Sequence, residues 1–282
     1  MPAFPKKSFN MMRNVLSILI YRSFHAVKDE QARAYLFLTG LLVVFVVLSS
    51  FSGAAQPLEK LKYDLRYSIF KGGEATLKVT STTYENKPAV HYHLEGNTTG
   101  VTDRLFSVHD IYESFVNPET SLPYLFIRNV KERNYRYYNE TRFFHDNDSL
   151  FSQRSGGKKV PADMVDFLSA FFYLRQHHYL DKLDHGEEFT IPVYHADEYF
   201  MMTVKYLGTE KIKSKMGVKE CHVISPRVAT GKLLKRSDGL KFYITKDEGR
   251  IPLLLEFDMV IGSLKCELDS YKKQGVDQLK KR

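Results

Sequence analysis

The densest group of side chains that could carry out chemistry lies past the middle of the chain, at His177, His178, Asp181 and His185. Imidazole and carboxylate groups are ligands for zinc, and a zinc-bound water could hydrolyse a substrate. The spacing of these residues matches no known zinc signature. The end of a helix that carries solvated histidines near its negative pole explains them better, so we predict no metal site and no cofactor.

A nucleophile for catalysis is equally hard to find. The sequence contains no Gly-x-Ser-x-Gly motif, and neither Cys221 nor Cys266 lies in a reactive-cysteine signature. The two cysteines could form a disulfide in an oxidising compartment or remain two small buried thiols in strands, and both alternatives stay open. We predict no catalytic residue. Enzymatic activity is undecided, with the weight of the sequence against it.

Strands are the elements that must position any site in this chain. Leu61, Tyr63, Leu65, Tyr67 and Ile69 alternate with polar residues, which is the period of a half-buried strand. A Lys-Gly-Gly turn at residues 71–73 predicts a hairpin to the next run. Strand-sized runs follow at residues 74–80, 90–94, 105–116, 123–130, 134–145, 188–194, 198–207, 218–225, 240–245, 251–259 and 263–271. Short strands joined by turns predict a mostly β fold with an antiparallel barrel-like or half-barrel sheet.

One segment departs from the strand period. Between Pro161 and His177 the apolar residues recur at helical spacing, and Pro161 and Asp163 suit a first helical turn. The pattern predicts one packed amphipathic helix. In a strand-rich domain such a helix either plugs the end of a barrel or covers an open sheet face, and in both places it would shape an interior cavity.

The N-terminal region predicts export. Residues 34–55 carry no charge, and six Lys or Arg against two Asp or Glu precede them, so we expect the N-terminus to stay in the cytoplasm. The run is either the apolar region of a signal peptide cut before Gln56 or an uncleaved signal-anchor helix. Residues 1–33 are then a cytoplasmic leader or the product of a mis-assigned start. Residues 56–282 are expected to form a single exported β domain.

The charge balance argues against a nucleic-acid partner. The whole chain has a formal net charge of +8, but past residue 55 it has 35 Lys plus Arg against 31 Asp plus Glu, which leaves about +4. Both signs are interspersed rather than gathered into a basic patch. We therefore predict that the exported domain binds no nucleic acid.

Several motifs resemble one family. They are Gly-Val-Thr-Asp-Arg-Leu-Phe-Ser-Val at residues 100–108 with Asp110 and Tyr112, Leu-Pro at 122–123, Asp-Phe-Leu-Ser-Ala-Phe-Phe-Tyr-Leu-Arg at 166–175, Thr-Lys-Asp-Glu-Gly-Arg-Ile-Pro at 245–252 and Ile-Gly-Ser at 261–263. Together they are similar to the bacterial exported family called domain of unknown function 3108, over residues 57–272. The resemblance implies a periplasmic β-rich domain and supplies no reaction, cofactor or catalytic residue.

The residues that match the family are the best candidates for a role. Three carboxylates are expected to have structural roles: Asp103 and Asp110 cap turns or bond strand ends, and Asp166 is a possible partner of Arg175. We expect Arg175 to hold an anionic head group at the mouth of an apolar cavity that Tyr112 and Phe171 line. The structural alternative for Arg175 is a pair with Asp166 or with a sheet carboxylate.

These observations lead to one functional expectation and two alternatives. We expect an exported bacterial envelope protein, periplasmic or anchored to the inner membrane, that binds an apolar or lipid-like ligand. The first alternative is a module that binds an envelope protein through a sheet edge. The second alternative is a metal-dependent hydrolase near His178. The oligomeric state is not predicted by any of these features.

Overall fold

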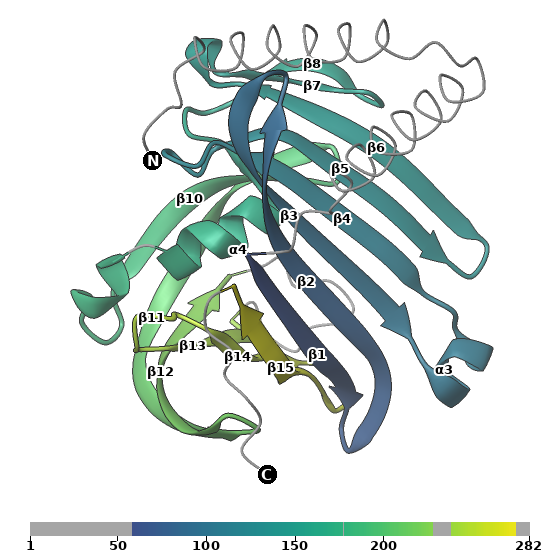
Figure 1. Ribbon diagram of the computed structural model, residues 1–282, viewed down its shortest axis with the longest axis vertical. Coiled ribbons are helices and arrows are strands. Elements are labelled where there is room, and N and C mark those ends of the chain that lie inside the picture. The colour runs from purple at the N-terminus through teal and green to yellow at the C-terminus, as the bar shows by residue number, and fades with distance from the viewer. Residues whose placement is uncertain (1–57, 177, 228–237, 275–282) are drawn as a thin grey trace, which may run out of the picture. The chain divides into compact units, whose positions relative to one another are not determined.

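The structure, a computed structural model, describes residues 58–176, 178–227 and 238–274. The chain divides into two units, and all of these residues belong to the second, Ala55–Arg282. They form one sheet of fifteen strands together with two α-helices (Figure 1). The expected leader and signal segment, residues 1–55, lie outside the described part. Within the described part, no helix combines the length and the apolar character that crossing a membrane requires.

Along the described part of the chain, the strands follow one another and are interrupted by two α-helices and two 3-10 turns. The first eight strands are β1 (Glu59–Tyr67), β2 (Phe70–Tyr84), β3 (Lys87–Thr98), β4 (His109–Val116), β5 (Pro123–Glu132), β6 (Tyr135–Phe144), β7 (Ser149–Ser152) and β8 (Gly156–Lys159). The remaining strands are β9 (Val165–Asp166), β10 (Glu188–His195), β11 (Glu198–Ser214), β12 (Gly217–Pro226), β13 (Leu240–Thr245), β14 (Pro252–Asp258) and β15 (Ser263–Lys273). The helices are α3 (Gly100–Leu105), α4 (Phe167–Gln176) and the 3-10 turns His145–Asn147 and His178–Asp181.

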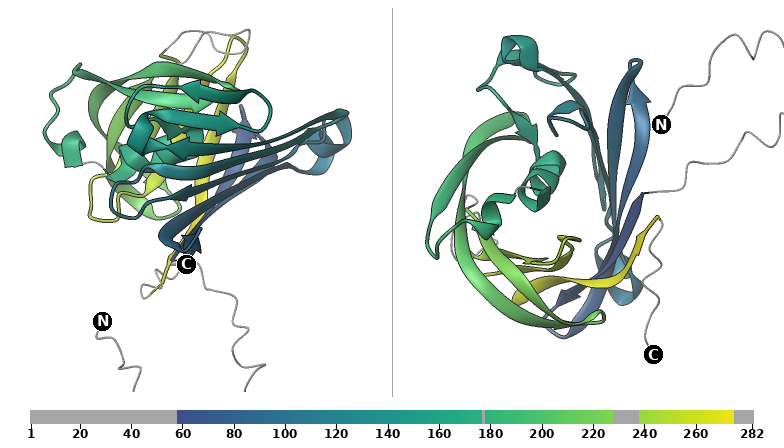
Figure 2. Two further views of the ribbon diagram at one scale, coloured as in Figure 1. Left: turned by 90° about the horizontal axis from the view of Figure 1, so that it is seen from above. Right: turned by 60° about the vertical axis from the view of Figure 1, so that its left-hand side comes forward.

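Strands that follow one another in the sequence also lie next to one another in the sheet, which is the order of a meander. In the middle of the sheet, the first strand, β1, pairs with the last strand, β15. The strand order runs β8-β7-β6-β5-β4-β3-β2-β1-β15-β14-β13-β12-β11-β10-β9, so β8 and β9 are the two edges. Neighbours are antiparallel, except that β9 lies parallel to β10. Figure 2 shows the sheet curled around α4. The predicted fold, a mostly β half-barrel sheet with one packed helix, is confirmed.

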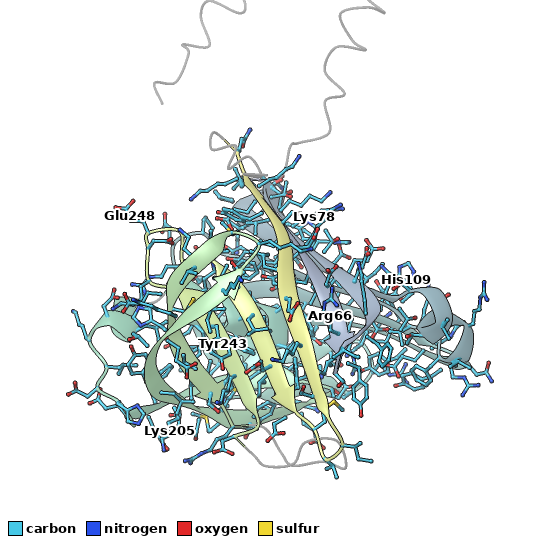
Figure 3. All side chains as sticks on the ribbon, turned by 90° about the horizontal axis from the view of Figure 1, so that it is seen from below. Arg66, Lys78, His109, Lys205, Tyr243 and Glu248 are labelled. Atoms are coloured by element: carbon cyan, nitrogen blue, oxygen red, sulfur yellow. The ribbon has the colours of Figure 1, made fainter. Side chains whose placement is uncertain are left out.

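The alternation of apolar and polar residues determines which face of each strand is buried. On β2, Leu77 and Val79 are 3% and 8% exposed, whereas Lys78 between them extends outward (Figure 3). A shift of one residue would exchange these faces, so the apolar pattern fixes the register. The same rule operates on the neighbouring strand, where Leu61 and Tyr63 are buried.

The first hairpin turns earlier than predicted. The chain reverses at Ser68 and Ile69, and the predicted turn residues Gly72 and Gly73 lie inside β2. A Cβ atom on Gly73 would lie 2.6 Å from the carbonyl oxygen of Asn97 on β3, which is closer than a side chain tolerates. The glycine is therefore required by a close approach of two strands rather than by a turn.

Helix α4 begins six residues later than the predicted start at Pro161, because Asp166 caps it. The Asp166 carboxylate accepts hydrogen bonds from the backbone N–H groups of Leu168 and Ser169, at 2.8 and 2.9 Å. The Ser169 hydroxyl accepts in return from the Asp166 N–H at 2.9 Å. This reciprocal arrangement fixes the first turn. Ser114 on β4 donates to the same carboxylate at 2.6 Å, which attaches the cap to the sheet.

Helix α4 is packed on more than one side. Leu168 and Phe172 belong to a core cluster with β1, β2, β3 and β15, whereas Ala170 and Leu174 belong to a second cluster with β10, β11 and β13. Phe171 is partly buried and contacts both clusters. The helix therefore packs against both halves of the curled sheet, β1–β8 and β9–β15, instead of covering one open face.

Candidate functional site

An arginine lies on the core-facing side of β5. Phe126 and Val130 are 3% and 1% exposed, and Arg128 lies between them on the same face of the strand. Its Nε is buried and has no hydrogen-bond partner in the described part of the chain. None of the ion pairs formed among the described residues includes it. The guanidinium is therefore a positive charge that forms no ion pair with a carboxylate of the described residues.

Aromatic rings surround this charge. The carbon at the centre of the Arg128 guanidinium lies 4.6 Å from the centre of the Tyr137 ring. Tyr112 lies opposite Arg128 on β4 and bonds to it through its hydroxyl. The centre of the Phe167 ring, on the first turn of α4, lies 5.8 Å from that of Tyr112 and 5.3 Å from that of His195. We call these five residues the Arg128 site.

The Arg128 site is neutral except for its arginine. Burial, followed by the charge of Arg128, lowers the pKa of His195 to about 4, so its imidazole is uncharged at neutral pH. The His195 Nδ1 is buried and unpartnered among the described residues. Phe167 is 45% exposed, so the site opens to solvent at the start of α4. The arrangement can accept one acidic group with an apolar body beside it.

A carboxylate in the β10–β11 turn joins the two ends of the sheet next to this site. Five side chains from β6, β7, the β7–β8 turn and β10 donate to Asp197, namely Tyr137 at 2.6 Å, Ser152 at 2.7 Å, Asn139 and Ser155 at 3.1 Å, and Tyr194 at 3.2 Å. We call this group the Asp197 cluster. It connects β6 and β7, near one edge of the sheet, to β10 and its turn, near the other edge. Backbone hydrogen bonds of the described sheet do not join these two groups of strands, because β8 and β9 are the two edges of the sheet. Tyr137 belongs to the cluster and to the Arg128 site.

The Asp197 cluster predicts an acid-dependent loss of stability. Partial burial alone would raise the pKa of Asp197, but hydrogen bonds from Tyr137, Ser152 and Ser155 outweigh it and lower the pKa from 3.8 to about 2. A carboxyl whose pKa falls on folding stabilises the native state above its unfolded pKa, and this stabilisation disappears as the pH falls from about 4 to about 2. We expect Asp197→Asn to lower the free energy of unfolding by about 1–2 kcal/mol near neutral pH and by much less near pH 2.

Urea unfolding followed by circular dichroism at several pH values measures this difference. Asp146→Asn is the matched control, because Asp146 is an exposed carboxylate in a 3-10 turn. It should change the free energy of unfolding by less than about 0.5 kcal/mol. A difference for Asp197→Asn that stays constant over the pH range would show that the charge of Asp197 contributes nothing.

Arg175, the predicted holder of an anionic head group, lies elsewhere and is occupied. Its guanidinium forms an ion pair with Glu59 on β1 at 2.6 Å and donates to the carbonyl oxygens of Arg250 and Gly249 at 2.7 and 3.0 Å. Arg175 is 6% exposed. The structural alternative is the one observed, with a sheet carboxylate as the partner rather than Asp166. Arg128, by contrast, forms no ion pair with any of the described residues.

The three predicted structural carboxylates all bond to the backbone or to hydroxyl groups. Asp166 caps α4, and its burial raises its pKa against the opposing effect of four hydrogen bonds. Asp110 accepts from the backbone N–H of Lys131 at 3.0 Å and so joins β4 to β5. Asp103, in the first turn of α3, accepts from the Thr98 hydroxyl at 2.8 Å.

The two predicted lining residues both pack against the first core cluster, but their rings have different neighbours. Tyr112 is in the Arg128 site, where burial raises its pKa. Phe171 lies one turn further along the helix, and the centre of its ring is 5.7 Å from that of Phe242 in the second core cluster. The structure therefore brings Tyr112 together with Phe167 rather than with Phe171.

The other candidates for chemistry whose side chains are described do not assemble into a site. Cys221 and Cys266 are both free thiols, and burial raises the pKa of each to about 11. Asp181 is bonded to the His222 imidazole and to Arg250. His177 lies outside the described residues. Among the residues that are described, no group of three or more His, Cys, Asp or Glu is placed to bind a metal ion.

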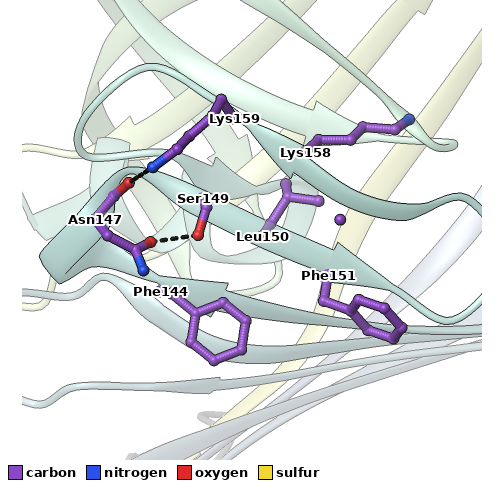
Figure 4. A pocket seen from close by; sticks show the side chains of 8 residues that line it. Phe144, Asn147, Ser149, Leu150, Phe151, Lys158 and Lys159 are labelled. Atoms are coloured by element: carbon purple, nitrogen blue, oxygen red, sulfur yellow. Dashed lines mark hydrogen bonds between the residues drawn. The ribbon is translucent and has the colours of Figure 1, made fainter.

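A shallow pocket of about 480 Å³ lies at the β8 edge of the sheet (Figure 4). Phe144 and Phe151 line it together with the stems of Lys158 and Lys159. Its polar groups are already bonded, because the Lys159 Nζ donates to the Asn147 carbonyl oxygen at 2.6 Å. No unpartnered charge points into it, so the Arg128 site is the better candidate.

The sequence analysis missed Arg128, His195 and Asp197. Arg128 gave a signal, because a charged residue stands at a position where the period of the strand requires an apolar one, between Phe126 and Val130. Asp197 gave none. Its turn resembles any other hairpin turn, and its partners are as many as 60 positions away in the sequence.

Comparisons with known proteins agree with the family and with the fold. The model of the family described as "Protein of unknown function (DUF3108)" matches residues 62–269. No curated protein matches the chain. A crystal structure titled as a beta-barrel-like protein of domain of unknown function DUF1849 from Brucella abortus superposes with a TM-score of 0.52 at 10% identity, over 78% of this chain and 99% of that chain. At this identity the likeness concerns the fold.

Proposed function

Because this chain belongs to the DUF3108 family, whose description assigns no activity, we propose its function from the Arg128 site. The protein is a binding module without enzymatic activity that holds a lipid-like molecule by its acidic head group. The observation that carries the proposal is Arg128 itself, a core-facing arginine whose buried Nε has no partner among the described residues. A buried donor without an acceptor is costly, and an acidic ligand would satisfy it.

The surroundings of Arg128 favour a ligand with an apolar body. Phe167, Tyr112 and His195 form a chain of neighbouring rings beside the charge, and Phe167 is the most exposed of them at 45%. A guanidinium binds carboxylate and phosphate oxygens in pairs, while rings bury a chain next to them. The Arg154 guanidinium lies 4.7 Å from the centre of the Tyr137 ring and adds a second positive charge.

We place this function in the bacterial envelope. The proposal rests on the uncharged run at residues 34–55, which would export the domain into the periplasm or anchor it to the inner membrane. Lipids and their acidic breakdown products are abundant in that compartment. Fractionation of cells that produce the full chain tests the location, and a cytosolic protein would contradict it.

The two alternatives have less support. The exposed edge β8 is four residues long and contains two glycines and two lysines, features that oppose pairing with a further strand. A metal-dependent hydrolase would need ligands beyond Asp181, whose carboxylate already bonds to His222 and Arg250. Binding of a lipid-like ligand is therefore the function that the described residues favour.

Replacement of Arg128 should weaken ligand binding. We expect the full chain to bind a fluorescent fatty acid, and Arg128→Gln to bind it roughly ten times more weakly or worse, because a hydrogen bond to a charged group contributes about 1.5–3 kcal/mol. The methyl ester of the same fatty acid carries no charge. It should bind both proteins equally, since the arginine has no anion to contact.

Arg142→Gln is the matched control, because Arg142 is an exposed arginine on the neighbouring strand β6. It should bind the fatty acid as the unsubstituted chain does. Mass spectrometry of lipids extracted from the purified chain gives a second measurement. If no amphiphile is bound on purification and neither the acid nor its ester binds in solution, the proposal is wrong.

A further inference from the structure

The most exposed apolar side chains gather on one set of turns. In the described part of the chain, seventeen large apolar residues are exposed, and the five with at least 70% exposure are Ile69, Phe70, Val101, Leu105 and Ile261. All five lie in the β1–β2 turn or at the first residue of β2, in α3 or in the β14–β15 turn. Surface patches of this kind are rare on a domain that contacts only water.

Less exposed apolar residues extend the same set. We define the apolar rim by four neighbouring segments. It consists of Tyr67, Ile69 and Phe70 where β1 turns into β2, Val101, Leu105 and Phe106 in α3 and directly after it, Tyr135 at the start of β6, and Val260 and Ile261 of the β14–β15 turn. Figure 1 shows α3 projecting from the end of β3 and β4, and Figure 3 shows His109, the first residue of β4, beside it.

Direct contacts make the rim continuous. The Tyr67 hydroxyl donates to the Ile261 carbonyl oxygen at 2.6 Å, which connects the β1–β2 and β14–β15 turns. The Thr99 N–H donates to the Gly72 carbonyl oxygen at 2.9 Å, which connects α3 to β2. The Arg133 N–H donates to the Ser107 carbonyl oxygen at 2.8 Å and adds the β5–β6 turn.

Three arginines accompany the apolar side chains. Arg104, Arg133 and Arg136 are exposed, and the ion pairs among the described residues do not include them. The Arg133 guanidinium lies 5.8 Å from the centre of the Phe106 ring, and Arg136 bonds only to nearby carbonyl oxygens. The carboxylate on α3, Asp103, already accepts from Thr98. The rim therefore has positive charges that are free to contact an anion.

We propose that the apolar rim docks on the surface of a membrane that contains anionic phospholipid. Aliphatic and aromatic tips on separate turns can enter between head groups, while arginines beside them contact phosphates. The core of a protein interface is instead a continuous apolar surface from which charged residues are depleted. The free arginines favour an anionic membrane as the one occupant. This docking surface is distinct from the Arg128 site and does not depend on the function proposed for it.

Depth-dependent quenching of a fluorophore tests the proposal on the full chain. A fluorophore is attached at Leu105→Cys, the chain is reconstituted in phosphatidylcholine vesicles that contain phosphatidylglycerol, and nitroxide-labelled lipids are the quenchers. Val218→Cys is the matched control, because Val218 is 64% exposed and lies on β12, which contributes no residue to the rim. Whatever residues 34–55 do in the bilayer is common to both labelled proteins.

We expect strong quenching at position 105 and little at position 218. Replacement of Arg104, Arg133 and Arg136 by Gln should reduce the docked population about fivefold for each arginine at low salt, and vesicles of phosphatidylcholine alone should give the same loss. Equal quenching at both positions, or none at position 105, would overturn the proposal. Quenching at position 105 that does not change with the lipid charge or with the replacement of the arginines would also overturn it. A label that is already buried by a second copy of the chain before vesicles are added would overturn it as well.

Discussion

Arg175→Ala should lower the free energy of unfolding by about 3–5 kcal/mol, because it removes the arginine from a largely buried ion pair and leaves the Glu59 carboxylate only the Tyr271 hydroxyl and Lys273, at 3.3 and 3.9 Å. The Glu59 and Arg175 side chains are 13% and 7% exposed, and their closest atoms are 2.6 Å apart. Arg175 also satisfies the carbonyl oxygens of Gly249 and Arg250, so the substitution removes three partners at once. Denaturant unfolding of the full chain measures the loss.

A second ion pair in the protein supplies the control. Arg227 and Glu188 also approach to 2.6 Å, but their side chains are 46% and 35% exposed. Arg227→Ala should therefore cost less than about 1 kcal/mol, since water solvates the remaining carboxylate. If both substitutions lower the free energy of unfolding by the same amount, the burial of the Arg175–Glu59 pair does not add to its stabilising effect, and the prediction is wrong.

The strands were the most predictable part of this fold. Apolar residues at every second position identify the face of each long strand, and Leu77 and Val79 on β2 illustrate the rule. The pattern fails where a strand is short. β8 has the sequence Gly-Gly-Lys-Lys, which contains no apolar residue, and it forms because β7 offers it an antiparallel partner.

Local boundaries were less predictable, because more than one residue can begin an element. Pro161 and Asp163 suit a helix start, and so does Asp166, which has Ser169 three positions later. Pairing of Val165 and Asp166 with β10 decides between them, because it holds these residues extended. In the same way residues 100–105 form α3, and the strand predicted from residue 105 begins at His109.

The candidate site shows what a sequence cannot supply without an alignment. Arg128 could be singled out by its position between two core residues, but nothing nearby in the sequence predicts that His195 lies beside it. Arg175 was assigned to a ligand because its partner, Glu59, lies 116 positions earlier. Residue types predict which side chains need a partner, whereas the curl of the sheet decides which partner they meet.

Phe172→Ala should cost about 3–5 kcal/mol, since a large buried ring would leave a cavity between the two halves of the sheet. Phe172 is 1% exposed, and the centre of its ring lies 3.5 Å from that of Tyr92 on β3, with the two rings nearly parallel. The ring of Phe171 packs against it edge-on at 5.5 Å. The free energy of unfolding, measured in denaturant, should fall without a shift in the acid-dependent transition of Asp197.

Phe167→Ala is the matched control on the same helix, because Phe167 is 45% exposed and lies in the Arg128 site. It should cost less than about 1 kcal/mol in stability, yet it should weaken binding of the fluorescent fatty acid by removing ring surface that a ligand would cover. Phe172→Ala should show the opposite pattern, with reduced stability and nearly unchanged binding below its unfolding transition. If both substitutions reduce stability equally and neither changes binding, α4 is only a core element and the ligand site lies elsewhere.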